Sequence, residues 1–371
     1  MRTLGSHAKG LRLERMKASP SWVEGSFRNI HPMLPNLRSG VMPSVGEFFR
    51  GGGRRVPDAP LPSLDPREAW ARPIDTGLRA TWLGHSTVLI EIDGARVLTD
   101  PVWGERVSPL GFVGPKRFQP VPIAISALPE LDAVIVSHDH YDHLDYPTIR
   151  QLADAEVPFV TSLGVGAHLE AWGVASERIF ELDWWETWQH PRKDLTITAA
   201  PSQHFSGRTP GKRNSTLWSS FVTRGSRHAA FFSGDTGLTT QYAEIRAKLG
   251  PFDLIMLEVG AHHPAWGDIH LGPDNALAAL DLLGGGAFLP VHWGTFSLAI
   301  HEWDQPVERL LELSPRAGVQ LVLPRIGEVV EPARVESVDI WWRAGGIREP
   351  SVREVETPSD ADAQTVEWPI D

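Results

Sequence analysis

The sequence contains no cysteine among its 371 residues. This absence excludes disulfide bonds, cysteine nucleophiles and metal sites built from thiolates, and it fits a reducing compartment. Any bound metal ion must therefore use the side chains of His, Asp or Glu as its ligands.

Long hydrophobic runs are also missing. No apolar stretch approaches the ~20 residues that a membrane-spanning helix needs. The basic residues of the first thirty positions are not followed by an apolar run of signal-peptide length. We therefore expect a cytoplasmic protein, for which any membrane contact would be peripheral, at the inner membrane surface.

Basic residues are fewer than acidic ones, 35 against 46, which gives a formal net charge of −11. Nucleic acids attract proteins with an excess of Lys and Arg, so a nucleic-acid partner is not expected. With 42% hydrophobic and 22% charged residues the composition is that of a globular protein.

Composition divides the chain into three segments. Residues 1–76 are rich in Pro and Gly, and their scattered aromatic residues predict a segment that wraps a folded domain. Residues 77–345 alternate strand-like and helix-like patterns and are expected to form that domain. Residues 346–371 are expected to form an acidic C-terminal tail.

The middle segment predicts an α/β fold. Two short apolar runs flank Asp93-Gly94, a dipeptide typical of a tight hairpin turn. Further on, predicted strands alternate with predicted helices, which indicates layered helices and sheet. The predicted strands include 88–92, 95–98, 157–160, 218–223, 229–232, 253–259 and 287–291, and the predicted helices are 146–153, 164–172 and 273–283.

The strongest chemical signal follows the apolar run 133–136. Directly after this run the sequence places His138, His140, Asp142 and His143. Imidazole and carboxylate groups suit zinc and its divalent neighbours, and so many of them cannot be buried together without partners. A solvated polar loop is the alternative, but the preceding strand fixes the origin of this loop in the core.

Three more strands end in a potential ligand. His204, Asp235 and His292 each follow an apolar run, and strand ends at one sheet edge are where α/β folds place their sites. A single histidine of this kind would more often be structural. Together the seven residues are too many for one tetrahedral ion and suit two metal ions that share a bridging carboxylate.

These motifs resemble the metallo-β-lactamase superfamily. The segments Gly84-His85-Ser86-Thr87, Gly114-Pro115-Lys116-Arg117-Phe118 and His292-Trp293-Gly294-Thr295-Phe296 are similar to the branch that contains N-acylphosphatidylethanolamine-hydrolysing phospholipase D. The resemblance covers about Leu78 to Glu312. It implies an αβ/βα sandwich, with two mixed β-sheets flanked by helices, and a hydrolase domain over residues 77–345. It also implies two divalent metal ions, Zn²⁺ first, with Mn²⁺ or Fe²⁺ as alternatives. A small molecule or a phospholipid is the substrate that the resemblance implies.

The resemblance also implies a role for each ligand. His138, His140 and His204 would hold the first metal ion, Asp142, His143 and His292 the second, and Asp235 would bridge the two. Asp142 would in addition orient or deprotonate the bridging water. His270 matches a family histidine near the substrate phosphate and would stabilise charge on the leaving side; a packed surface histidine is the alternative.

Five residues are candidates for substrate contact. Lys116 and Arg117 could hold a phosphate or carboxylate, or could be surface charge beside packed aromatic residues. Tyr141 lies inside the ligand motif, where it could equally pack under the loop. His262 and His263 occupy a stretch where the phospholipase has Gly-Ala-Tyr and then Pro-Arg. That arginine is absent here, and the two histidines are either new substrate contacts or structural.

Three functions compete at this point. The first is a phosphodiesterase of the phospholipase D type, in which a hydroxide that bridges the metals attacks phosphorus. The second is a metal-dependent lactonase that resembles L-ascorbate-6-phosphate lactonase. The third is a non-enzymatic protein that kept the fold, which the complete ligand set argues against. The phosphodiesterase is favoured by the segments at Gly114 and His292.

Overall fold

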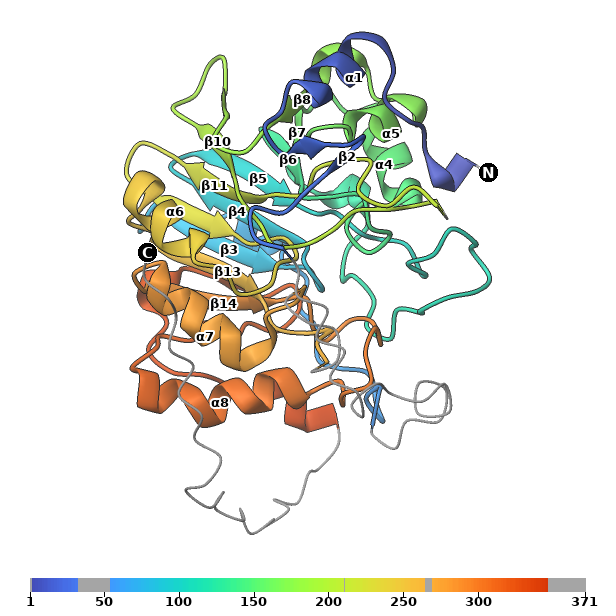
Figure 1. Cartoon of the computed structure of the whole chain (residues 1–371). Helices are drawn as coiled ribbons and strands as arrows, with labels where there is room; N and C mark the ends of the chain where they lie inside the picture. The colour runs from blue at the N-terminus through green and yellow to red at the C-terminus, as the bar shows by residue number, and fades with distance from the viewer. Residues whose placement is uncertain (1, 33–53, 210, 264–268, 346–371) are drawn as a thin grey trace, which may run out of the picture.

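The computed structural model describes residues 2–32, 54–209, 211–263 and 269–345 (Figure 1). The predicted acidic tail lies outside these ranges, as do residues 33–53 of the predicted N-terminal segment. In the described parts of the chain, no helix combines the length and the apolar character needed to cross a membrane.

Two mixed sheets form the centre of the molecule. The first sheet has the order β15 (Val329–Val330), β3 (Leu78–Trp82), β4 (Val88–Ile92), β5 (Ala95–Thr99), β6 (Ala133–Val136), β7 (Phe159–Ser162) and β8 (Ile179–Leu182). Neighbouring strands from β15 to β5 are antiparallel, and those from β5 to β8 are parallel. The second sheet has the order β14 (Ala287–Val291), β13 (Leu254–Glu258), β12 (Ala229–Phe232), β11 (Ser220–Arg224), β10 (Thr196–Ala200) and β9 (Thr187–Gln189). Its first three strands are parallel and the others antiparallel.

Helices cover the outer faces of both sheets. Figure 1 shows α4 and α5 on one side of the sheet pair and α6, α7 and α8 on the other. The helices are α1 (Gly10–Lys17), α3 (Arg67–Trp70), α4 (Tyr146–Leu152), α5 (Gly166–Ala171), α6 (Gln241–Leu249), α7 (Gly272–Leu282) and α8 (Gln305–Ala317). This arrangement confirms the predicted αβ/βα sandwich with two mixed sheets flanked by helices.

Strand alternation explains why the first sheet is apolar on both faces. Along β6, Ala133 and Ile135 join the large core between the sheets, whereas Val134 and Val136 pack on the helix side. Successive side chains of a strand point to opposite faces, so a strand covered on both sides needs an unbroken apolar run. The predicted runs at 229–232 and 287–291 are strands β12 and β14 with those bounds.

The hairpin around Asp93-Gly94 is present, and Ile92 pairs with Ala95 across it. The strand predicted at 157–160 is shifted to Phe159–Ser162. Pro158 has no N–H to donate, and its carbonyl accepts from the Val134 N–H just before β7 begins. The strand predicted at 218–223 is likewise displaced, to Ser220–Arg224.

Residues 2–32 lie against the domain near α5 and β8. Arg12 of α1 pairs with Glu170 and Glu181, at 2.6 and 2.5 Å. Met16 and Phe27 are buried in a small cluster whose other buried members are Leu163, Trp184, Leu217 and Trp218. The antiparallel pair β1 (Trp22–Val23) and β2 (Ser26–Phe27) completes this segment.

Candidate metal centre

The candidate ligands come from loops that follow strand ends. His85 follows β3, the loop His138–His143 follows β6, His204 follows β10, Asp235 follows β12 and His292 follows β14. In the parallel parts of both sheets these ends meet at one edge, as the alternation of strands predicted. All of these side chains except His140 and Asp142 are buried.

One group of potential ligands consists of His138, His140, His204 and Asp235. His138 Nε2 and His204 Nε2 lie 2.9 and 3.2 Å from His140 Nδ1. Burial lowers the pKa of all three histidines, and two of them well below the usual value. Three neutral imidazole nitrogens therefore face one another at a distance that suits a shared cation.

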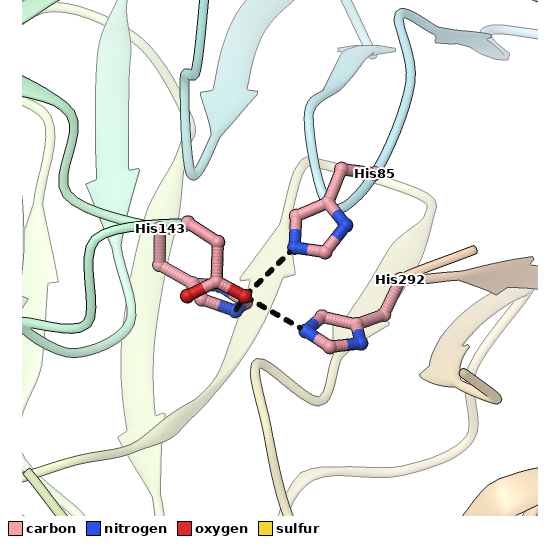
Figure 2. Close-up of side chains that lie close together, drawn as sticks. His85, His143 and His292 are labelled. Atoms are coloured by element: carbon pink, nitrogen blue, oxygen red, sulfur yellow. Dashed lines mark hydrogen bonds and ion pairs between the residues drawn. The ribbon is translucent and has the colours of Figure 1, made fainter. Parts of the chain in front are cut away.

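A second group consists of His85, Asp142, His143 and His292. Figure 2 shows the three histidines pointing toward a common carboxylate. Asp142 Oδ2 lies 3.1 Å from His85 Nε2, 3.3 Å from His292 Nε2 and 3.5 Å from His143 Nε2. This group is a separate ligand set directly beside the first.

Asp235 lies between the two groups and faces both. Its Oδ1 is 3.1 Å from His143 Nε2 and 3.2 Å from His292 Nε2. Its Oδ2 is 3.8 Å from His138 Nε2 and 3.7 Å from His204 Nε2. One carboxylate thus presents one oxygen to each group, which is the geometry that a bridging ligand requires.

The buried atoms of this cluster fit a pair of cations. His143 Nε2, His292 Nε2 and Asp235 Oδ1 are buried and make no hydrogen bond within the described residues, although they face one another at 3.1 and 3.2 Å. Buried polar atoms are normally hydrogen-bonded, and a cation between these nitrogens and the carboxylate oxygen would satisfy them. The donors are imidazole nitrogen and carboxylate oxygen, which suit divalent zinc, manganese or iron.

Hydrogen bonds outside the cluster fix which ring nitrogen faces inward. His143 Nδ1 donates to Asp100 Oδ2 at 2.7 Å, and His204 Nδ1 donates to the carbonyl of Ile269 at 2.8 Å. Ser137 gives its hydroxyl proton to Asp100, so its oxygen accepts from His138 Nδ1 at 2.9 Å. With Nδ1 engaged in this way, Nε2 is the atom of each ring that faces inward and that would bind a metal ion once it carries no proton.

In the second group, the carboxylates favour protonated histidines, and the histidines favour ionised carboxylates. Burial disfavours a charge on His143 and His292, but Asp235 and Asp142 outweigh it and raise the pKa of His143 well above its usual value and that of His292 to about 10. The same histidines hold the pKa of both carboxylates well below the usual range, against the effect of burial. A divalent cation would take the place of the protons on these rings.

Two of the histidines have left-handed backbones, with φ of 52° at His85 and 66° at His292. Such conformations are strained for residues with a Cβ and persist only when the surroundings enforce them. Here the N–H of His292 donates to the carbonyl of His85 at 3.0 Å, and Trp82 Nε1 donates to the same oxygen at 2.8 Å. The strain is of the kind that accompanies functional sites.

His270 lies beside the cluster. Its ring centroid is 5.1 Å from that of His204 and 5.5 Å from that of His292. Its Nδ1 is 2.7 Å from the buried carboxylate of Glu258. Burial alone would lower the pKa of His270, but Glu258 outweighs this effect and raises it. The position is compatible with the predicted contact to the leaving side of a substrate.

The other predicted substrate contacts have protein partners. The Tyr141 hydroxyl donates to the carbonyl of Arg208 at 2.7 Å, and the Arg208 guanidinium covers the Tyr141 ring. Lys116 Nζ pairs with Glu105 at 2.9 Å, on the surface. Arg117 is half-buried and donates to the carbonyls of Val102 and Gly104.

The two consecutive histidines are half-buried beyond the end of β13. The ring of His262 stacks on that of His301 with centroids 4.8 Å apart. Burial lowers the pKa of His262 to about 3, so this ring is neutral at physiological pH. His263 follows it, also half-buried.

Sequence reasoning missed two residues of the cluster. His85 belongs to the Gly84–Thr87 motif, but a lone histidine after a strand is usually structural and does not by itself indicate a ligand. Glu258 lies near the end of the predicted strand 253–259. A charged residue inside a fully buried apolar run is a usable signal, since it must find a partner.

Comparison with known proteins assigns the family. A model of the beta-lactamase superfamily domain matches residues 95–293, more than half of the chain. Together with the sandwich fold and the His/Asp clusters, this match shows that the chain belongs to the metallo-β-lactamase superfamily and is a metal-dependent hydrolase of that superfamily. The predicted family is thereby confirmed.

Comparison with individual relatives identifies the branch of the superfamily. An uncharacterized protein of Mycobacterium tuberculosis is 44% identical over 346 residues, which cover 92% of this chain and 91% of that protein. The N-acyl-phosphatidylethanolamine-hydrolyzing phospholipase D 1 of Caenorhabditis elegans is 36% identical over 250 residues, 64% of this chain and 70% of the relative. The chain therefore lies in the branch that resembles this phospholipase, as the sequence motifs indicated.

Solved structures agree on the fold. The isothiocyanate hydrolase from Delia radicum gut bacteria has a TM-score of 0.55 and 20% identity, and the match covers 68% of this chain and 98% of that one. A possible metal-dependent hydrolase from Veillonella parvula has a TM-score of 0.56 and 15% identity, with 68% and 98% covered. At such identities the likeness shows the fold alone.

Proposed function

We propose that this chain is a binuclear phosphodiesterase of the N-acylphosphatidylethanolamine phospholipase D type. The observation that carries the proposal is the position of Asp235, which presents one oxygen to each of two ligand groups. The relative from Caenorhabditis elegans supports the phosphodiester substrate. A metal-dependent lactonase is the alternative, because the same groups can serve an attack on an ester carbonyl.

Each of the two ligand groups would hold one metal ion. His138, His140 and His204 would hold one divalent cation, zinc first, with manganese or iron as alternatives. Asp142, His143, His292 and the newly found His85 would hold the other, and Asp235 would touch both. When bound, such a pair lowers the pKa of water and neutralises charge on a phosphodiester.

The remaining chemistry falls to side chains of the chain itself. Asp142 is ionised and only partly buried, so it can accept a proton from the attacking water or orient it. His270 lies beside His204 and His292, in a group with Asp235. With its raised pKa it can place a positive charge or a proton near the leaving oxygen.

A phospholipid substrate would require contact with a membrane surface. Phe112 is 80% exposed at the tip of the loop between β5 and β6, and Val113 beside it is 49% exposed. We propose that this tip makes a peripheral contact with zwitterionic bilayers. Phe112→Asp should reduce sedimentation with phosphatidylcholine vesicles; equal sedimentation of the variant and the wild type would contradict the contact.

The function is tested by metal analysis and turnover in one preparation. We expect two metal ions per chain and hydrolysis of bis-p-nitrophenyl phosphate, with a long-chain N-acyl phosphatidylethanolamine and a lactone panel assayed in parallel. His138→Ala and Asp235→Asn should lose metal and at least 10³-fold in turnover, a typical scale for essential groups. His31→Ala, an exposed histidine outside the cluster, is the matched control.

Each alternative gives a different result. Turnover of lactones only, with two metal ions bound, would replace the phosphodiesterase by the lactonase. A protein that takes up no metal after loading with zinc or manganese would contradict both enzymatic proposals.

A further inference from the structure

Glu258 is a fully buried carboxylate at the C-terminal end of β13, with none of its surface exposed. Burial of a charge is costly unless every oxygen has a partner. Glu258 Oε1 accepts from the backbone N–H groups of Thr236 at 2.8 Å and Leu271 at 3.3 Å. Its Oε2 lies 2.7 Å from His270 Nδ1. The carboxylate thus joins three parts of the chain.

Through these partners Glu258 contacts the residues next to, or beside, the candidate ligands of the metal centre. Thr236 follows the bridging candidate Asp235, and Leu271 follows His270 in the sequence. His292 Nδ1 is 3.9 Å from Glu258 Oε2. Asp100 is a second buried carboxylate beside the cluster, and it accepts from His143 Nδ1 at 2.7 Å. Two buried carboxylates therefore contact the Nδ1 atoms of histidines at the centre, Asp100 at His143 and Glu258 at His270.

We propose that Glu258 is a positioning residue for His270, which it holds with Nδ1 protonated so that Nε2 is the ring atom that meets the substrate. The role of His270 at the substrate rests on the proposed function, whereas the state of its ring does not. Glu258 does not itself contact substrate, because it is fully buried and both of its oxygens are already engaged.

Replacement by glutamine separates this role from simple packing. Glutamine has nearly the same shape but only one oxygen, and three N–H groups would compete for it. If that oxygen stays with Thr236 and Leu271, the amide NH₂ faces His270 Nδ1. The ring must then accept at Nδ1 and carry its proton on Nε2. Glu258→Gln should therefore exchange the tautomer of His270 while the fold and the neighbouring backbone remain.

The tautomer can be read directly by nitrogen chemical shifts. The experiment uses full-length protein labelled with ¹⁵N-histidine, zinc-loaded, with long-range ¹H–¹⁵N correlation of the imidazole rings at pH 8. Signals of His270 are assigned by their loss in His270→Ala. We expect Nδ1 of His270 to be protonated in the wild type and unprotonated in Glu258→Gln. Asp100→Asn is the matched control, which should move the signals of His143 and leave those of His270 in place.

Two results would overturn the proposal. The first is an unprotonated Nδ1 in the wild type, a measurement that does not depend on whether the variant folds. The second is a folded Glu258→Gln protein, with the zinc content of the wild type, in which His270 keeps its signals.

Steady-state kinetics test independently whether Glu258 acts through His270. With bis-p-nitrophenyl phosphate, Glu258→Gln should lower kcat by about 10- to 100-fold, the usual effect of removing an outer partner of a metal centre, and leave KM nearly unchanged. In a His270→Ala background the same substitution should cause no further loss. Additive losses would contradict an action through His270. A wild-type protein without phosphodiester turnover would instead contradict the proposed function, and the nitrogen shifts would still decide the role of Glu258.

Discussion

His85 shows how much of a site a single residue can change. Its Nε2 lies 3.1 Å from Asp142 Oδ2, and burial together with the neighbouring His292 lowers the pKa of His85 to about 3. A neutral imidazole at this position is a suitable donor for a divalent cation. The second ligand group would then have one more histidine than the sequence motifs indicated.

We predict that His85→Ala weakens the binding of the second metal ion by at least about tenfold and leaves the first nearly unchanged. Stepwise zinc titration against a chromogenic chelator measures both affinities, with His190→Ala as a control histidine away from the cluster. Unchanged metal affinities combined with lost turnover would show that His85 acts on the substrate instead.

The protons of the second group predict how metal binding depends on pH. His143 and His292 carry raised pKa values in the metal-free protein, so both rings are protonated at neutral pH. A metal ion must displace these protons, and its affinity should therefore fall as the pH falls. The expected slope is about tenfold per pH unit for each proton released. Zinc competition between pH 6 and 8 measures the slope; a pH-independent affinity would contradict this assignment of charge.

The seven candidate ligands could be found from the sequence because each follows a strand that is itself recognisable. His85 also follows a strand, β3, but it stands alone there, and Glu258 lies within a strand and not after one. Their importance depends on contacts between distant strands, such as the hydrogen bond from His292 N–H to the His85 carbonyl. Arg117 illustrates the opposite case. It was a candidate for substrate binding, yet the structure uses its guanidinium to hold backbone carbonyls.

At the scale of elements, the close approach of β13 and β14 positions His292. A Cβ built on Gly260, just after β13, would lie 2.0 Å from the carbonyl oxygen of His292. No side chain fits without moving the backbone at the end of β14. The glycine is therefore required by proximity and not by its own torsion angles.

We predict that Gly260→Ala destabilises the protein by roughly 1–3 kcal/mol, a common cost of overpacking, and also weakens the second metal site. Gly111→Ala is the matched control, because a Cβ at that position meets no atom within 4 Å. Urea unfolding with and without zinc gives both quantities. If the two variants were equally stable, the contact at His292 would not constrain the loop.

Element types were more predictable than element ends. Strands β12 and β14 have the predicted bounds because both are short apolar runs buried on two faces. Helix α8 was not predicted, since Pro306 and Pro315 both lie within its span. Pro306 is tolerated in the first turn, where an N–H would have no partner in the helix. Pro315 lies in the last turn, shortly before the left-handed Gly318 ends the helix.

At the scale of the whole molecule, the N-terminal segment reaches a ligand 175 residues away in sequence. Asn29 Nδ2 donates to the carbonyl of His204 at 2.8 Å, and Asn29 Oδ1 accepts from the N–H of the same residue at 3.1 Å. Asn29 Oδ1 also accepts from Trp218 Nε1 at 2.9 Å. The side chain thus closes a pair of hydrogen bonds on the backbone of a candidate ligand of the first group.

Asn29→Ala should therefore affect the first metal site as well as stability. It leaves the N–H and the carbonyl of His204 without these partners, at an expected cost of about 1–3 kcal/mol in the free energy of unfolding. Zinc affinity of the first group should fall with it, because His204 is no longer held on the side away from the cluster. Arg28→Ala is the control. It removes only an exposed ion pair with Glu24 at 3.5 Å, and such pairs contribute little. If Asn29→Ala changed neither quantity more than Arg28→Ala does, residues 2–32 would be a covering of the domain without influence on its metal centre.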